Sequence, residues 1–352
     1  MAINLSACTN IGAGSINRDR IDYAEAMARS WKEQLLLNIV KLRYGDTPMF
    51  LEVSSVISSY QMQSQVNVGG TVSSNLTPGL PDTVGRSLSI GGSGVYTDKP
   101  TITYTPLQGD KFTRSLLRPI APTALMQLVQ AGYPIDVIFQ LGIRAINGSY
   151  NRSNRPMGMR DADPEFYRIL DALRRVQQSE SIAFRLEKGG SEETTLLMLH
   201  NRRISPEVEQ DIRFLRQALG LQQGAQELIL TYGAIPRSDR EVALLTRSTL
   251  EIYLELGARI QASEADVKAG RVLDVPPAHS EIGPRDQPLI FIYSGETPPE
   301  DPFVTVHYGQ HWFWIENNDY RSKSIFSFLL LLSSLAEAGV PQQAPIITIP
   351  AN

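Results

Sequence analysis

The sequence predicts an α+β fold, in which a mixed α/β body carries a long inserted amphipathic β-hairpin. Two patterns predict this class. Helix-like and strand-like periods alternate from residue 108 to the C-terminus, and a period of two runs through residues 53–97, much further than in an ordinary strand. With 352 residues, 42% of them hydrophobic, the chain is long and apolar enough to bury a core.

Charge and cysteine content exclude several classes of protein. The 33 basic and 37 acidic residues give a net charge of −4. A nucleic-acid-binding surface usually shows a basic excess, so no nucleic-acid partner is expected. The single cysteine excludes an internal disulfide framework and a cysteine-based zinc site. The sequence contains no run of about 18 apolar residues, so no membrane-spanning helix is expected.

A short motif surrounds that cysteine. The stretch Leu5–Cys8, Leu-Ser-Ala-Cys, resembles the bacterial lipobox, in which a signal peptidase cuts before a cysteine whose sulfur is then acylated. The resemblance implies that residues 1–19 are an N-terminal anchor segment and that acylated Cys8 binds membrane lipid. It also implies a place at the periplasmic side of the bacterial outer membrane. A free thiol near the chain terminus is the alternative interpretation.

Residues 20–48 hold the first predicted element, a helix over 20–43. Asp19 is its predicted N-cap, and Gly45 with Pro48 ends it. Its apolar residues recur at three- and four-residue spacing: Ile21, Ala24, Met27, Ala28, Trp31, Leu35, Ile39 and Leu42.

Residues 49–107 are predicted to form one long β-hairpin. Between 53 and 97 only Asp82 and Arg86 are charged. If Tyr60 lies opposite Tyr96, the turn is centred on position 78 and one face stays apolar along both arms.

Successive strand residues point to opposite faces, so the even-numbered and odd-numbered positions of this hairpin are assigned to different faces. The even positions predicted to face lipid are Tyr60, Met62, Val66, Val68, Val72, Leu88, Ile90 and Tyr96. The odd positions predicted to line a lumen are Gln61, Gln63, Gln65, Asn67, Thr71, Ser87, Ser89 and Ser93. Because these polar residues carry no charge, a lumen that they lined would select weakly between ions.

The length of the hairpin favours a membrane barrel. Twenty residues of strand extend about 66 Å, whereas a transmembrane strand needs about 9–11 residues. One face apolar and the other polar is what a membrane barrel wall requires. A lone two-stranded ribbon would leave backbone groups without partners in a bilayer, so several copies would have to close a ring.

A lipobox-like start followed by an α/β body with an inserted hairpin is similar to the oligomeric outer-membrane lipoprotein channels of the curli-export type. The similarity covers Leu5–Cys8 and residues 49–107. In that family each subunit donates β-strands to one shared barrel, with two hairpins where this chain offers one. The resemblance implies a homo-oligomeric ring whose hairpins build a pore for transport or export. The stretch 308–335 also resembles uncharacterised bacterial lipoproteins, which implies no function.

Other uses of the hairpin stay open. In a periplasmic scaffold lipoprotein it would be an assembly arm that docks on a periplasmic protein partner or on a neighbouring subunit by strand addition. It could also belong to a soluble β-layer, as in a sandwich or an adhesin. Gly70, Gly92 and Gly94 on the apolar face weigh against lipid contact because they offer little apolar surface.

The body, residues 108–352, is predicted to alternate helix and strand, with a division into two subdomains near 271–288. Ser238 and Glu241 predict a capping box that opens a helix to about residue 261. Helices are predicted at 110–117, 122–131, 164–178, from 206 to 219 and at 321–338. Strands are predicted at 181–187, 194–200, 226–232, 289–293, 303–308, 311–315 and 346–349. Residues 135–146 fit either type.

No motif predicts an enzyme, a metal site or a cofactor. The sequence has neither H-E-x-x-H nor a glycine-rich phosphate loop ending in Gly-Lys-Ser/Thr. His307 and His311 flank a predicted hairpin turn and are interpreted as packing residues. Arg152, Arg155 and Arg160 lie in a predicted loop over residues 147–163 that is rich in Asn, Arg, Gly and Pro. They are interpreted as solvated, and contact with anionic lipid or polysaccharide is the alternative.

Overall fold

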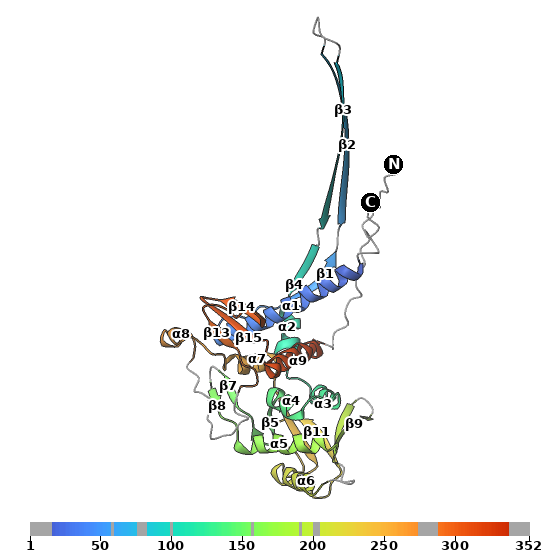
Figure 1. Cartoon of the computed structure of the whole chain (residues 1–352). Helices are drawn as coiled ribbons and strands as arrows, with labels where there is room; N and C mark the ends of the chain where they lie inside the picture. The colour runs from blue at the N-terminus through green and yellow to red at the C-terminus, as the bar shows by residue number, and fades with distance from the viewer. Residues whose placement is uncertain are drawn as a thin grey trace. The chain divides into compact units, whose positions relative to one another are not determined.

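The computed structural model describes residues 16–57, 60–75, 83–98, 101–155, 158–189, 192–199, 205–273 and 288–337 (Figure 1). The chain divides into two compact units. The first unit takes Met1–Phe50 and Gln108–Pro341, and the second takes Leu51–Leu107 and Gln342–Asn352. Helices and several small sheets make up the described chain, so the predicted α+β class is confirmed.

The second unit contains four strands that pair in antiparallel fashion. β1 pairs with β4 and β2 pairs with β3 (Figure 1). Their bounds are β1 Leu51–Ile57, β2 Tyr60–Asn75, β3 Thr83–Asp98 and β4 Thr101–Pro106. Val56 lies opposite Ile102 and Tyr60 lies opposite Asp98, so both strand pairs follow one register.

A six-stranded sheet forms one layer of the first unit, in the order β6-β5-β12-β11-β10-β9. Only β11 and β12 run parallel; the other neighbours are antiparallel. The bounds are β5 Ile143–Ile146, β6 Ser149–Tyr150, β9 Ile182–Gly189, β10 Glu192–Leu199, β11 Glu227–Tyr232 and β12 Glu241–Thr246.

Asn147 and Gly148 form the two-residue turn between β5 and β6. Their φ angles are 44° and 82°. Positive φ at both central positions is the type I′ turn that Asn-Gly favours. The Asn147 amide also joins β12, because it donates to the Glu241 carbonyl (3.2 Å) and accepts from the Ala243 N–H (2.7 Å).

Helices lie near this sheet (Figure 1), namely α3 Pro122–Gln130, α4 Ile135–Gly142, α5 Pro164–Gln178 and α6 Pro206–Ala218. α5 packs against both α4 and α6. Pro164 occupies the first turn of α5, where its fixed φ suits a helix and its missing N–H is not needed. The buried residues of α5 are Phe166, Tyr167, Ile169, Leu170, Ala172, Leu173 and Val176.

A second layer of the first unit joins residues from both ends of the chain. α1 (Ile16–Arg43) packs against β14 and α7. α7 spans Thr249–Gly257, and α9 spans Tyr320–Glu337. The remaining elements are β7 Ser153–Arg155, β8 Gly158–Arg160, β13 Tyr293–Gly295, β14 Pro302–Tyr308, β15 His311–Glu316, α2 Gly109–Phe112, α8 Glu264–Lys268 and the π-helix η1 Thr113–Leu117.

A glycine lets α1 and α7 approach closely. A Cβ atom on Gly257 would lie 2.9 Å from the Ile39 carbonyl oxygen, nearer than real Cβ atoms come. The hydroxyls of Tyr253 and Ser333, 2.6 Å apart, link α7 to α9 in the same layer. The interhelical contact therefore depends on a residue without a side chain at position 257.

The hairpin predicted near the C-terminus is confirmed. Tyr308 pairs with His311, which leaves Gly309 and Gln310 as the two-residue loop. Gly309 has a φ of 62°, the positive value that a type II′ turn requires at its first central position. β15 also pairs with β13, and Phe313 and Ile315 on β15 are fully buried.

The helix predicted from Ser238 to residue 261 is wrong. Residues 241–246 form strand β12, and the helix begins only at Thr249. The Glu241 carboxylate accepts from the Arg237 N–H (2.8 Å) and so closes a turn. The capping box lies ten residues later, where Ser248 Oγ accepts from the Glu251 N–H and the Glu251 carboxylate accepts from the Ser248 N–H.

Other boundaries differ less. The first helix begins at Ile16 rather than 20, and residues 135–146 contain both helix α4 and strand β5. The predicted strand 289–293 is replaced by the short β13, which starts at Tyr293. The predicted loop after residue 147 contains β6, β7 and β8. The predicted strand 346–349 lies outside the described residues.

Candidate functional site

The β2–β3 pair holds the positions that the sequence assigns to lipid and lumen. Tyr60–Asn75 pair residue by residue with Thr83–Asp98. Each even position lies opposite an even position, as Val68 opposite Ile90 does, and each odd position lies opposite an odd one. Since successive strand positions alternate between faces, the predicted lipid-facing positions share one face and the predicted lumen-lining positions share the other.

The register differs from the predicted one by two residues. Tyr60 lies opposite Asp98, and Tyr96 lies opposite Met62. The symmetry point of the pair is therefore position 79 rather than 78. A shift of two leaves every residue on its predicted face, because the side-chain period is also two.

A β-bulge at Ser54 preserves the apolar face in the neighbouring pair. The register shifts between Val53 and Ser55, and the Ser54 hydroxyl donates to the Thr103 carbonyl (3.1 Å). Before the bulge the apolar residues stand at odd positions, as Val53 does, and after it at even positions, as Val56 does. One extra residue therefore moves the alternation back into phase.

The described side chains of the second unit are largely open to solvent in the single chain. Val68 is 67% exposed, Tyr104 52% and Ile102 40%. Gln65 and Asn67, on the polar face, are also exposed. In the described chain no third strand borders the β2–β3 pair.

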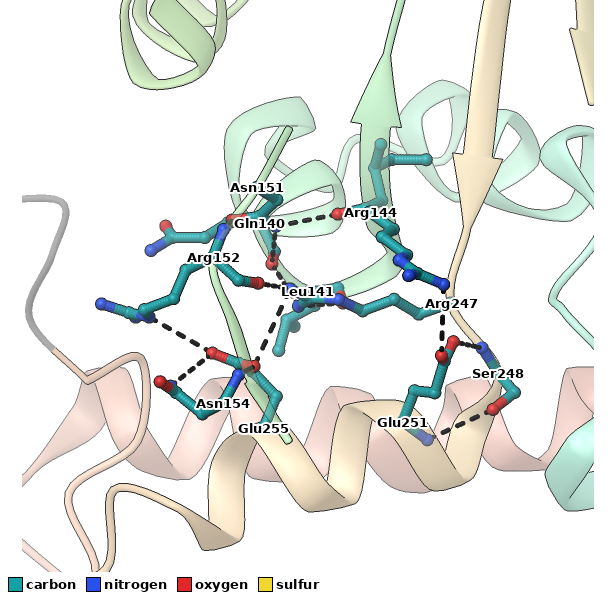
Figure 2. A network of polar contacts seen from close by, with 11 residues as sticks. Gln140, Leu141, Arg144, Asn151, Arg152, Asn154, Arg247, Ser248, Glu251 and Glu255 are labelled. Carbon is teal, nitrogen blue, oxygen red and sulfur yellow. Dashed lines mark hydrogen bonds and ion pairs between the residues drawn. The ribbon is translucent and has the colours of Figure 1, made fainter. Parts of the chain in front are cut away.

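The first unit contains a buried polar network between α4, β7 and α7 (Figure 2). Arg247 donates to the carbonyls of Gln140 and Leu141, both at 3.2 Å, and to the Arg152 carbonyl. The carbonyls of Gln140 and Leu141 belong to the last turn of α4, where a helix has no internal donors for them. Arg247 is therefore a cap for the C-terminus of α4.

Glu255 on α7 supplies a negative charge to this network. Its carboxylate accepts from Arg152 Nε (3.2 Å) and from Asn154 through the backbone N–H and the side-chain amide, both at 2.8 Å (Figure 2). Its distance to Arg247 Nη2 is 3.9 Å. The interpretation of Arg152 as a solvated loop residue is wrong: it is 7% exposed because Glu255 supplies a counter-charge from 103 positions away.

A small cavity adjoins the network but is too small for an organic substrate. Its volume is about 20 Å³, and its lining includes Arg152, Arg247, Glu255 and Leu289. That volume accommodates about one water molecule. The network therefore joins the C-terminus of α4 and strand β7 to α7.

A second polar cluster ties α8 to its surroundings. Asp266, 4% exposed, accepts from the Tyr44 hydroxyl (2.8 Å) and from Arg271 Nη1 (2.7 Å), and His311 Nε2 lies 3.6 Å away. Burial alone would raise the Asp266 pKa, but the hydrogen bonds from Arg271, Tyr44 and Ser263 outweigh it and hold that pKa below its ordinary value. Burial and the bond to Asp266 raise the pKa of Tyr44.

The two histidines near the predicted turn make different contacts. His307 packs edge-on against Trp312, with ring centroids 4.9 Å apart, and His311 faces Asp266. Across the described ranges, no three His, Cys, Asp or Glu side chains gather as a metal site.

The predicted anchor, Cys8, lies outside the described residues. In the part of the chain that the structure describes, no helix combines the length and the apolar character needed to cross a membrane. No protein-family model, curated protein or solved structure matches the chain.

Proposed function

We propose that the protein is a lipid-anchored subunit of a homo-oligomeric ring at the bacterial outer membrane, whose hairpins build a shared β-barrel pore for transport or export. The observation that carries the proposal is the register of the second unit. In the described pairs from Val56 opposite Ile102 to Asn75 opposite Thr83, one register places the even positions, mostly apolar, on one face and the odd positions, mostly polar and uncharged, on the other.

The exposed apolar face supports a partner of low polarity. Val68, a large apolar side chain of β2, is 67% exposed among the described residues. A two-stranded hairpin is at best marginally stable alone, so a pair with sixteen residues in each strand needs added contacts. Lipid on the apolar face and neighbouring strands on both edges supply them.

Ring closure sets the size of the assembly. Each copy contributes two membrane strands, and neighbouring copies pair through the outer edges of β2 and β3. Barrels of about 16 strands enclose an aqueous channel, whereas barrels of about eight are filled by side chains. A conducting ring of this protein therefore contains more than about four copies, and about eight copies would match the 16 strands of an aqueous channel.

The polar face suits uncharged hydrophilic cargo. Its positions in β2 and β3 are mainly amides, hydroxyls and glycines, such as Gln65, Asn67 and Ser93, and they include no charged residue. Cys8 would hold the subunit at the membrane while the hairpin inserts.

Glycines on the apolar face favour a second candidate, a periplasmic scaffold lipoprotein with the hairpin as an assembly arm. Gly70, Gly92 and Gly94 share the face with Val68. Without side chains they would let a protein partner pack closely over that face, whereas they offer little apolar surface to lipid. The two candidates differ in what lies against Val68: lipid in the ring, protein in the arm.

Reconstitution tests the proposal. The full chain is incorporated into phosphatidylethanolamine–phosphatidylglycerol vesicles, and release of neutral sugars of graded size is measured. The ring predicts release up to a size limit, with none from a matched chain that lacks residues 60–98 but keeps its far-UV helix signal. Vesicles that retain all sugars, with the protein stably bound through Cys8, would favour the scaffold.

A further inference from the structure

β2 and β3 together contain two charged residues, one toward each end of the strand pair. They are Arg86 and Asp98, both on β3 and both at even positions. Arg86 lies opposite Val72, and Asp98 lies opposite Tyr60. Both charges therefore fall on the apolar face, one toward each end of the strand pair, and no charged residue lies between them on either strand.

Their spacing matches the thickness of a bilayer. Asp98 follows Arg86 by 12 positions. At about 3.3 Å per residue this distance is roughly 40 Å along the strand. Barrel strands tilt by about 35–45°, which reduces the height to roughly 28–33 Å. The hydrocarbon core of a bilayer is about 30 Å thick.

We propose that the bilayer hydrocarbon covers the even face between Arg86 and Asp98, with one charge at each membrane–water interface. This inference rests on the proposed ring. The midplane then falls at Val66 and its partner Gly92, halfway between the two charges. Tyr60 lies opposite Asp98, and Tyr96 lies two positions before Asp98 on the same strand. Both tyrosines are then near the membrane–water interface, where aromatic residues are enriched.

The residues within this window fit the assignment. The large ones are Met62, Val66, Val68, Leu88, Ile90 and Tyr96, and the others are Ser64, Gly70, Gly92 and Gly94. None is ionisable at neutral pH, whereas a charge on the lipid face costs most at the midplane and little at the interfaces. The placement of Arg86 and Asp98 follows that depth rule.

The assignment also orients the hairpin. Asp98 marks the interface on the side of β1 and β4, which continue the same register toward the first unit in the sequence. Arg86 marks the opposite interface, beyond which the strands lead into residues 76–82. Ile102 and Tyr104 then lie outside the hydrocarbon. If the hairpin were an assembly arm that docks on a protein, the distance between Arg86 and Asp98 would not have to match the thickness of a bilayer.

Depth-dependent quenching tests the window. Single cysteines at Val66, Tyr60 and Val72 are labelled with an environment-sensitive dye, in the full chain assembled in phosphatidylethanolamine–phosphatidylglycerol vesicles. The parent chain, whose only cysteine is Cys8, is the blank. Lipids carry a nitroxide either at mid-chain or on the headgroup. A second series at Ile90 and Val84 keeps the test decisive if one substitution blocks assembly.

The window predicts a reversal of ranking. The mid-chain nitroxide should quench position 66 most, and the headgroup nitroxide should quench 60 and 72 most. In the second series, the mid-chain nitroxide should quench a dye at position 90 strongly, whereas a dye at position 84 should lie outside the hydrocarbon and be quenched weakly. Equal mid-chain quenching at 60, 66 and 72 would overturn the window and leave the ring standing. No lipid quenching at any position, in an assembled oligomer, would overturn both.

Discussion

The Val66→Arg substitution should prevent the hairpin from entering a bilayer. Val66 lies opposite Gly92, halfway between the charges of Arg86 and Asp98. An arginine on the lipid face of a barrel costs about 2–4 kcal/mol at the bilayer midplane. Since about 1.4 kcal/mol is a tenfold change in an equilibrium, each subunit should insert about 30- to 700-fold less favourably.

Two matched variants separate this effect from a general effect of added charge. Gln65→Arg puts the same side chain one position away, on the polar face, and should insert as the parent does. Val72→Arg, at the interface, should cost about 0–1 kcal/mol for its depth and about 0.2–1 kcal/mol for repulsion from Arg86, which lies opposite.

Co-flotation with phosphatidylethanolamine–phosphatidylglycerol vesicles after a carbonate wash measures the inserted fraction of each variant. The expected order is parent and Gln65→Arg first, Val72→Arg close behind, and Val66→Arg last. Equal flotation of Val66→Arg and Gln65→Arg would refute the assignment of the even face to lipid.

Three further predictions concern the first unit. Glu255→Gln should lower the unfolding free energy by about 3–5 kcal/mol in urea titrations, because it removes the negative charge from a buried network. The control Glu264→Gln, in an exposed ion pair, should cost at most about 1 kcal/mol. Equal costs would contradict a structural role for the network. Gly257→Ala should cost about 1–3 kcal/mol in the same assay, because its Cβ would press on the Ile39 carbonyl, and an unchanged midpoint would contradict the close approach of α1 and α7. Asp266 has a lowered pKa, so its contribution to folding stability is full above its unfolded-state pKa of about 3.9 and is lost as pH falls through its folded-state pKa. The difference in unfolding free energy between the parent and Asp266→Asn should be constant from pH 5 to 8 and shrink below about pH 4. A constant difference down to pH 2.5 would contradict this prediction.

Local patterns predict several helix and turn boundaries correctly. Pro164 and Ser205 opened helices where expected, and Gly309 made the two-residue hairpin turn. These features depend on neighbours within a few positions of the chain. The signal at Asn147-Gly148, the strongest short hairpin pattern, was present in the sequence and was missed.

The errors arose where local signals compete or where partners are distant. Ser238-x-x-Glu241 and Ser248-x-x-Glu251 have the same form, and only the buried strand between them decides which one caps a helix. Ser54 looks like any polar strand residue, yet it is the bulge that sets the phase of β1. Arg152 looked solvated because its carboxylate partner is supplied by a distant helix.

The particle mass in detergent decides whether the hairpins of several subunits build one barrel. The full chain, extracted from membranes and measured by light scattering with the detergent contribution subtracted, should form one discrete species of more than about four subunits. The chain lacking residues 60–98 should not form it. A full chain that stays monomeric in detergent and needs no detergent to remain in solution would contradict the shared barrel.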